Sequence, residues 1–253
     1  MQQSTVKTIW TRQRRHLPVV APPALQVSRN AKTGVSLNVL MHGSCRPTRH
    51  CYQTCYGLLG PISMANALHV YGANLARLNA LADASSAEIT READRLADAC
   101  RAAGQDFLRV HGVGDLVAGT IRLINRLSRR HPGLRLWVST RKADLARQIV
   151  CRPNVHLMLS TDCSTQPADW TAFRQIVSTR RGQAFLAYVQ SRADEVVPAD
   201  VRIVFAQHVG SARARWAPEP RTCPATVHTQ YGGAEHDGAC SRCRRCFDAA
   251  RRR

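Results

Sequence analysis

Seven of the ten cysteines in this chain fall into two groups that offer different numbers of metal ligands. The front group is Cys45, Cys51 and Cys55, and the back group is Cys223, Cys240, Cys243 and Cys246. Four thiolates complete the coordination of a metal ion or an iron–sulfur cluster, whereas three leave one position open for chemistry. The sequence therefore predicts a metalloprotein in which the front group is the reactive centre.

The front group has the spacing Cys-x5-Cys-x3-Cys within a polar, loop-like stretch. Such short spacings let one loop place three ligands around one face of a cluster, and the neighbouring Arg46 and Arg49 favour thiolates. His42 and His50 offer a fourth ligand, which would close the site around zinc instead. The pattern favours the open cluster and leaves the zinc site as the alternative.

The back group combines Cys223-Pro224 with the tight spacing Cys240-x2-Cys243-x2-Cys246. This pattern is typical of a [4Fe–4S] cluster, although a zinc ribbon uses similar thiolates. The glycines and histidines between the cysteines indicate a loop that is folded by its metal. A third arrangement, in which all seven cysteines surround one or two shared centres, is also consistent with the sequence.

Length and composition indicate the setting of these cysteines. A chain of 253 residues with 44% hydrophobic residues can bury one core without disulfides. The sequence shows neither a signal peptide nor an apolar run near the length of about 18 residues that a membrane span needs. We therefore expect a cytoplasmic protein without a membrane partner, and in that reducing compartment clustered cysteines indicate metal ligands.

The charge of the chain is strongly positive and unevenly distributed. The formal net charge is +19, no Asp or Glu precedes Asp83, and the chain ends in three arginines. A surplus of this size attracts polyanions, so DNA or RNA is the expected partner, bound by the basic arm and the Arg-rich tail. The alternative is that these arginines are solvated on helix faces. Few residues are aromatic (6%), so a stacking platform for single strands is not evident.

Apolar strand-like runs alternate with segments of helical length along most of the chain. We expect strands at 37–40, 107–110, 134–140, 155–160, 184–189 and 201–207, and helices at 61–82, 86–102, 116–130, 143–150 and 170–178. Continuously apolar strands separated by helices are typical of a parallel sheet covered on both faces. The predicted fold class is α/β, with a partial or full (β/α) barrel-like sheet. This domain spans residues 31–212, between a basic, irregular arm (1–30) and a cysteine-rich metal-binding tail (213–253).

Polar residues follow the expected strands, where barrel-like folds gather their working groups. They are His111-Gly112-Val113-Gly114-Asp115, Ser139-Thr140-Arg141, Ser160-Thr161-Asp162 and Gln207-His208. The alternative is that each group caps the following helix, which we favour for Ser160 and Thr161. For His111 and Asp115 a ligand-binding role is favoured, because the adjacent glycines let a ligand approach the backbone closely.

Several of these motifs together resemble the gene-product-88 family of phage and plasmid proteins. The resemblance covers about residues 28–248 and is carried by the motifs 30–34, 109–115 and 137–141, the front cysteines with Tyr56, and the cysteine-rich tail. More distantly, the order of three-cysteine loop, helix, and strand with a glycine–acid turn is similar to radical S-adenosylmethionine enzymes.

The second resemblance implies a mechanism. Cys45, Cys51 and Cys55 would hold a [4Fe–4S] cluster whose open iron binds S-adenosylmethionine, and reductive cleavage would yield a 5′-deoxyadenosyl radical. The turn with His111, Gly112, Gly114 and Asp115 would receive the cofactor, and the back group would hold a second cluster. This chain departs from that pattern in its x5, x3 cysteine spacing and in a Gly-Asp turn that replaces Gly-Gly-Glu.

Two functions follow from these observations. The first is an iron–sulfur enzyme that acts on an unknown, anionic substrate. The second is a non-enzymatic, basic zinc- or cluster-binding protein that binds nucleic acid.

Overall fold

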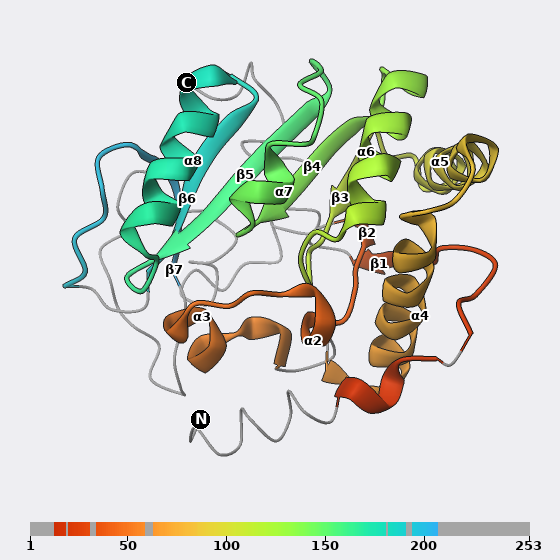
Figure 1. Ribbon diagram of the computed structural model, residues 1–253, viewed down its shortest axis with the longest axis horizontal. Helices are drawn as coiled ribbons and strands as arrows, with labels where there is room; N and C mark the ends of the chain where they lie inside the picture. The colour runs from red at the N-terminus through yellow and green to blue at the C-terminus, as the bar shows by residue number, and fades with distance from the viewer. Residues whose placement is uncertain are drawn as a thin grey trace.

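The computed structural model describes residues 13–18, 20–30, 34–58, 63–180, 182–190 and 194–206. Over these ranges the chain forms an α/β fold, in which a seven-stranded, mostly parallel sheet is flanked by helices (Figure 1). The expected cysteine-rich tail, with all four back-group cysteines, and the strand-end residues Gln207 and His208 lie outside the described residues.

The strands follow one another in the sheet in the order of the sequence. They are β1 (Ser28–Asn30), β2 (Gly34–Leu37), β3 (Phe107–Val110), β4 (Arg135–Thr140), β5 (Val155–Asp162), β6 (Ala184–Gln190) and β7 (Val201–Ala206). β1 pairs with β2 in antiparallel fashion, and all the other neighbours pair in parallel. Each parallel crossover therefore joins adjacent strands, and the carboxyl ends of β2 to β7 lie at one edge of the sheet.

The helices that flank the sheet are α4 (Ala65–Leu81), α5 (Ser86–Ala102), α6 (Ala118–Arg130), α7 (Ala143–Ala146) and α8 (Pro167–Thr179). Local signals explain two of the helix starts. The Ser85 side chain accepts a hydrogen bond from the backbone N–H of Glu88 and caps α5, and Pro167 occupies the first turn of α8. None of the helices within the described ranges is long and apolar enough to cross a membrane.

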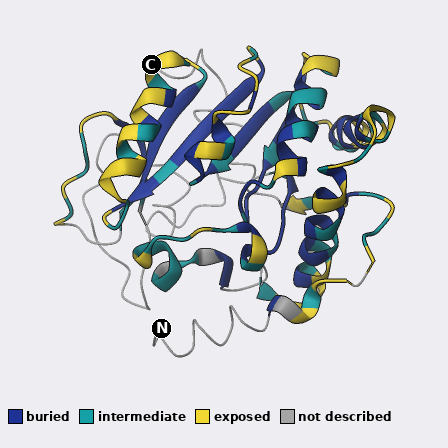
Figure 2. Cartoon of the chain, viewed as in Figure 1, coloured by how far each residue is buried: buried dark blue, intermediate teal, exposed yellow. Residues whose placement is uncertain are grey.

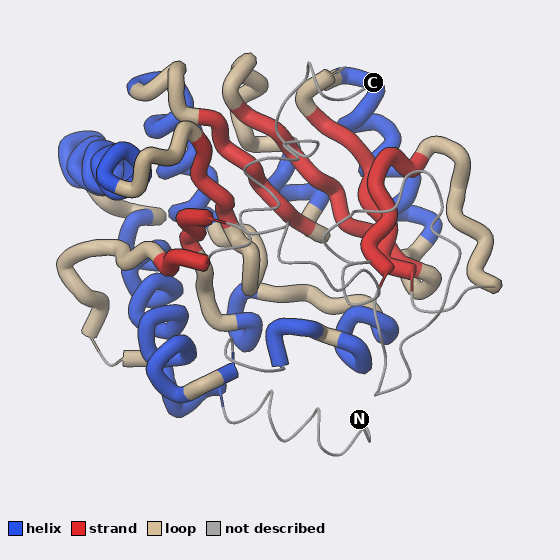
Figure 3. The backbone as a smooth tube through the Cα atoms, turned by 180° about the vertical axis from the view of Figure 1, so that it is seen from behind, coloured by secondary structure: helices blue, strands red, loops and turns tan. Residues whose placement is uncertain are grey.

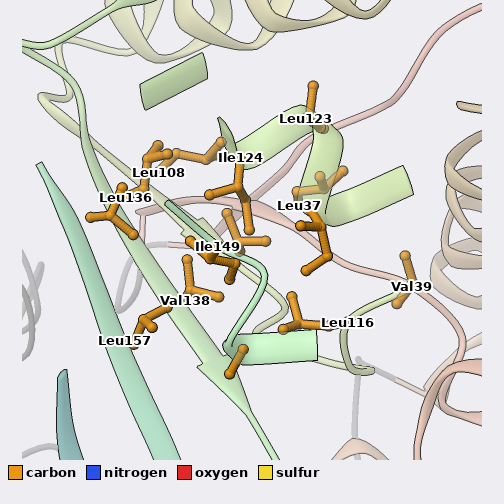
Figure 4. Close-up of a cluster of buried hydrophobic side chains, with 14 of the residues drawn as sticks. Leu37, Val39, Leu108, Leu116, Leu123, Ile124, Leu136, Val138, Ile149 and Leu157 are labelled. Carbon is orange, nitrogen blue, oxygen red and sulfur yellow. The ribbon is translucent and has the colours of Figure 1, made fainter. Parts of the chain in front are cut away.

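The main core lies between one face of the sheet and α6, α7 and α8, and it continues between α4, α5 and α6 (Figure 1). Figure 4 shows its centre, where side chains of β3, β4 and β5 meet Leu123 and Ile124 of α6. The central parallel strands are buried along most of their length, whereas the outer faces of the helices are exposed (Figure 2). This burial explains why the strands have continuous apolar runs in the sequence.

Part of the expected arm, residues 13–18 and 20–30, lies in the described part of the chain. Within it the 3-10 helix η1 (Gln13–His16) packs against α4, and β1 pairs with β2. The backbone N–H of Leu25 donates to Glu92, which also accepts hydrogen bonds from Arg77. The sequence did not indicate β1, because its three residues are polar and show no alternation.

The described strands form an open sheet and not the full barrel that was one of the two expected forms. β1 and β7 are the two edges of this sheet among the described strands. The physical reason is visible at β2, whose outer edge is already paired with β1 and is therefore closed to β7. The second face of the sheet carries a smaller cluster, with Phe107, Trp137, Met158, Phe185, Ala187 and Ile203.

Close contact between α4 and α6 leads to a testable prediction about Gly119 in α6. A Cβ atom at Gly119 would lie 1.8 Å from the carbonyl oxygen of Leu78 in α4. Alanine is the better helix former by about 1 kcal/mol. The overlap would nevertheless push the helices apart, at a typical cost of about 1–3 kcal/mol. We expect Gly119→Ala to lower the free energy of unfolding measured in urea.

Gly133→Ala is the matched control, because nothing lies within 4 Å of a Cβ atom at that position. We expect its stability to change by at most about 0.5 kcal/mol. A Gly119→Ala protein as stable as the control would contradict the close approach of α4 and α6.

Candidate functional site

The front cysteines lie on a short, partly helical segment at the edge where the parallel strands end (Figure 1). The segment contains α2 (Met41–Ser44), α3 (Arg49–Thr54) and the 3-10 helix η2 (Tyr56–Leu58). Cys45 is the C-cap of α2, Cys51 lies within α3, and Cys55 is the C-cap of α3. The prediction that the front cysteines lie on a plain loop was therefore wrong. Thr48 caps a short helix, α3, that the polar sequence did not indicate.

Thr48 connects the cysteine segment to the sheet. Its hydroxyl oxygen accepts a hydrogen bond from the backbone N–H of Cys51 (3.0 Å), which caps α3. The same hydroxyl donates to Oδ2 of Asp162 at the end of β5 (2.6 Å). The side chain of Thr48 therefore fixes both the start of α3 and the distance between α3 and the end of β5.

Asp162 is also the partner of Arg141, which follows β4. The Nη1–Oδ2 distance is 2.7 Å, and the side chains are 14% (Arg141) and 0% (Asp162) exposed. The other carboxylate oxygen accepts from the backbone N–H of Ser164 (2.8 Å). Asp162 thus neutralises a buried cation and holds the segment of Thr48, and it does not cap α8, whose N-cap is Gln166.

Asp115, an expected cofactor-binding residue, is buried (4% exposed) and engaged by its own chain. Its Oδ1 atom accepts from the hydroxyl of Thr140 (2.6 Å) and the N–H of Leu116 (2.7 Å), and Oδ2 accepts from the N–H of Arg141 (3.2 Å). The N–H of Asp115 donates to Ser44 Oγ beside Cys45 (3.1 Å). Asp115 therefore joins the ends of β3 and β4 to the cysteine segment.

Close packing requires the glycine at position 114 of the same turn and leaves little room beside Gly112. Gly114 has φ +84°, and a Cβ atom there would lie 2.3 Å from Cγ2 and 2.6 Å from the carbonyl oxygen of Val39. A Cβ atom at Gly112 would lie 2.9 Å from Oδ1 of Asn38 and 3.1 Å from the guanidinium of Arg109. The turn therefore lies directly against the segment that follows β2.

His111, the fourth expected cofactor-binding residue, faces α6. It is 2% exposed, has φ 59°, and its Nε2 atom lies 3.2 Å from the hydroxyl of Thr120. Burial, and next the positive charge of Lys142, lowers the pKa of His111 to about 3. The imidazole is neutral at physiological pH, and its hydrogen bond to α6 supports a positioning role.

The three thiols influence one another electrostatically. A hydrogen bond from Cys55 lowers the pKa of Cys51 to about 7, and the charge of Arg141 lowers it as well, against the effect of burial. The same hydrogen bond and burial raise the pKa of Cys55, whose Sγ atom also lies 3.2 Å from Sδ of Met41. Burial, and next the negative charge of Asp115, raises the pKa of Cys45. Cys51 is therefore the thiol that ionises first.

The prediction of a metal centre stays a prediction at this point. Within the described ranges no three His, Cys, Asp or Glu side chains are placed so that they could hold a metal ion. This finding covers Cys45, Cys51 and Cys55 with the expected alternative ligands His42 and His50. The back group cannot be placed, because it lies outside the described residues.

The structure brings the polar ends of β3, β4 and β5 to one edge of the sheet, whereas the expectation that they face a common pocket stays a prediction. Sequence reasoning had singled out Arg141, Asp162 and Asp115 there. It missed Thr48 and also Lys142, whose Nζ atom donates to the carbonyl oxygen of Leu116 (2.7 Å). A Thr three residues before a predicted ligand is an N-cap signal that could have indicated α3.

The sequence matches the family model of gene product 88 over residues 8–249. The chain belongs to the gene product 88 family. No curated protein matches the sequence significantly. Among solved structures, an endo-beta-N-acetylglucosaminidase from Cordyceps militaris in apo form is similar at 14% identity and a TM-score of 0.33, over 78% of this chain and 75% of that chain. A similarity of that size carries no argument about this member of the gene product 88 family.

The double role of Thr48 gives a prediction for this gene product 88 protein. Thr48→Val removes both the cap of α3 and the hydrogen bond to Asp162, whereas Thr48→Ser keeps the hydroxyl. We expect the valine variant to lose about 1–3 kcal/mol of unfolding free energy in urea. The serine variant should stay within about 0.5 kcal/mol of the unmodified protein. Equal stabilities of the two variants would mean that the hydroxyl does not anchor the segment.

The pKa values of the thiols give a second prediction. Only thiolates are alkylated rapidly, so in metal-free protein the labelling of Cys51 by iodoacetamide should rise as the pH passes about 7. Cys100 is the internal comparison, because burial raises its pKa to about 12 and it should stay unlabelled at the same pH. Peptide mass spectrometry over a pH series measures both. Labelling of Cys51 that starts only in the ordinary thiol range would contradict the hydrogen bond from Cys55.

Proposed function

We propose that this protein is an iron–sulfur protein in which Cys45, Cys51 and Cys55 hold a [4Fe–4S] cluster, and that it acts as a radical S-adenosylmethionine-like enzyme on an anionic substrate. The observation that carries the proposal is the common placement of three interacting thiols at the carboxyl edge of a parallel sheet. Enzymes with sequential β/α units place their reacting groups at this edge.

The donor set is suited to a cluster. Thiolates are the ligands of iron–sulfur clusters, and each of the three binds a different iron atom. A single-ion site, which the described residues lack, needs all ligands around one metal atom, whereas a cluster takes one thiolate on each of three irons. The pKa of Cys45 is raised by burial and next by the negative charges of Asp115 and Cys51, and a metal centre would relieve that charge repulsion.

The topology also supports the proposal. The sequential parallel order of β2 to β7 is the order that (β/α) barrels use, and the cysteine segment directly follows β2, the first parallel strand. The next strand, β3, ends in the turn with Gly114 and Asp115. This is the order of parts in the radical S-adenosylmethionine enzymes that the sequence resembles.

The bound cluster and its cofactor would supply one-electron reduction and radical formation. The chain itself would position the cluster through Thr48 and Asp162 and favour a negative charge on Cys51 through Arg141. Oδ2 of Asp115 accepts one hydrogen bond, so it keeps a lone pair for an ammonium donor such as that of methionine.

A nucleic-acid-binding protein is the second candidate, and the charges of the described surface favour it. Arg147 and Arg152 have no carboxylate partner in the described part of the chain, and Arg180 donates to the carbonyl oxygen of Arg147 (2.8 Å). Such unpaired arginines add to the net charge of +19 that attracts polyanions. This candidate requires both cysteine groups to be structural.

Metal analysis after anaerobic purification tests the proposal. We expect brown protein with about eight irons if both cysteine groups hold cubane clusters, and about four if only one does. Replacement of Cys45, Cys51 and Cys55 by serine should remove about four irons and abolish the binding of S-adenosylmethionine in calorimetry. Serine at the four back-group positions should leave that binding intact.

A protein with Cys151→Ser and Cys163→Ser is the matched control, because both thiols are exposed and lie outside the two groups. It should keep the iron content and cofactor affinity of the unmodified protein. Colourless protein that contains zinc alone would overturn the cluster and leave the nucleic-acid-binding candidate. Iron-loaded protein that binds no S-adenosylmethionine would overturn the enzyme.

A further inference from the structure

Arg109 of β3 is a cation on the sheet face opposite α6, α7 and α8. It alternates with Leu108 and Val110, which are buried in the main core, and it shares its side of the sheet with Phe107 and Trp137. In the view from behind, none of the described helices lies over this face (Figure 3). The guanidinium therefore faces away from the helix layer.

The guanidinium of Arg109 is held in place without a counter-ion. Its Cζ atom lies 4.7 Å from the centroid of the Trp137 ring. On another side Gly112 lies so close that a Cβ atom added to this glycine would be 3.1 Å from the guanidinium. Among the described residues it has no ion pair, and its buried Nε atom has no hydrogen-bond partner. Stacking on Trp137 is worth about 0.5–2 kcal/mol, which offsets only part of the cost of desolvating an unpaired cation.

Arg174 provides an internal comparison. Its guanidinium lies 5.2 Å from the ring centroid of Trp170, and it is also paired with Asp200 at 2.7 Å. The same stacking motif therefore occurs twice in the described chain, once with a carboxylate and once without. The position that Asp200 fills for Arg174 is not filled by a described residue at Arg109.

Two further polar groups without a described partner lie on the neighbouring strands. Ser36 of β2 is the register partner of Arg109, is 3% exposed, and has a buried hydroxyl without a hydrogen bond in the described ranges. Ser139 of β4 lies two residues after Trp137 on the same face. Its hydroxyl is also buried and has no hydrogen bond in the described ranges. β2, β3 and β4 thus present unused donors to the same side of the sheet.

We propose that Arg109, with the hydroxyls of Ser36 and Ser139, forms a binding site for an anionic oxygen group, a carboxylate or a phosphate, of the substrate. Guanidinium and hydroxyl donors suit such oxygens. The site is continuous with the cofactor turn, because Gly112 contacts both Arg109 and Asn38 of the segment after β2. The assignment of this group to the substrate rests on the proposed function, whereas anion binding itself needs no cluster.

Anion titrations of the full-length protein at low ionic strength test the site. Inorganic phosphate and acetate serve as the two probes, and binding is followed by calorimetry and by tryptophan fluorescence, since Trp137 lies beneath the guanidinium. We expect saturable binding of at least one probe, and the preferred probe identifies the anion as phosphate or carboxylate. Arg109→Gln should weaken the affinity about tenfold or more, and Arg109→Lys should weaken it less.

Arg174→Gln is the matched control, because it removes one positive charge and one stacked arginine elsewhere on the chain. It should leave the affinity unchanged, which excludes a general effect of charge. Ser139→Ala, which leaves the guanidinium in place, should weaken binding a few-fold and keeps the proposal testable if Arg109→Gln does not fold.

Three outcomes would overturn the site: no saturable binding by the unmodified protein, equal affinities for Arg109→Gln and Arg174→Gln, or no change in Ser139→Ala when Arg109→Gln is unfolded. These outcomes do not depend on the iron content or on S-adenosylmethionine. Failure of the anion site and failure of the proposed enzyme can therefore be told apart.

Discussion

The buried ion pair between Arg141 and Asp162 is the interaction on which the geometry of the cysteine segment depends. Asp162 also accepts the hydroxyl of Thr48, which caps the helix of Cys51. Removal of one partner from such a pair leaves a buried charge and typically costs about 3–5 kcal/mol. Arg46 of the same segment also pairs with Asp144 of α7, but this pair is exposed and contributes about 1 kcal/mol at most. The segment is therefore tied to the sheet through Asp162, which the ion pair with Arg141 holds in place, and also through the contact of Asp115 with Ser44.

The charges around the segment determine which of its thiols ionises first. Besides burial, neighbouring negative charges raise the pKa values of the thiols: Asp115 acts on Cys45 and Cys51, Asp162 acts on Cys51, and the thiols act on one another. Within the described chain Arg141 is the cation that favours ionisation of Cys51, and Lys142 acts on Cys45. With these two cations alone, only Cys51 ionises near neutral pH. Metal binding at such thiols would displace the remaining protons.

The sequence predicted the order of strands and helices well, because the strands are buried on a parallel sheet and carry continuous apolar runs. Its failures have physical reasons. β1 has three polar residues, and α3 has fewer than two turns, so neither shows a period that can be recognised. The edge on which Asp115, Arg141 and Asp162 meet was predictable from the parallel topology. The hydrogen bond between Thr48 and Asp162 was not, since it depends on how the segment lies over β5.

The separation of Thr48 and Asp162 in the chain has a consequence for biosynthesis. The two residues are 114 positions apart, and all three front cysteines precede Asp83, the first acidic residue. The thiols therefore leave the ribosome long before β4 and β5 have been made, and domains are built from the amino terminus onwards. During that interval the cysteines have neither their anchor nor their neighbouring cation. The placement of Cys51 is therefore completed only when β5 has joined the sheet.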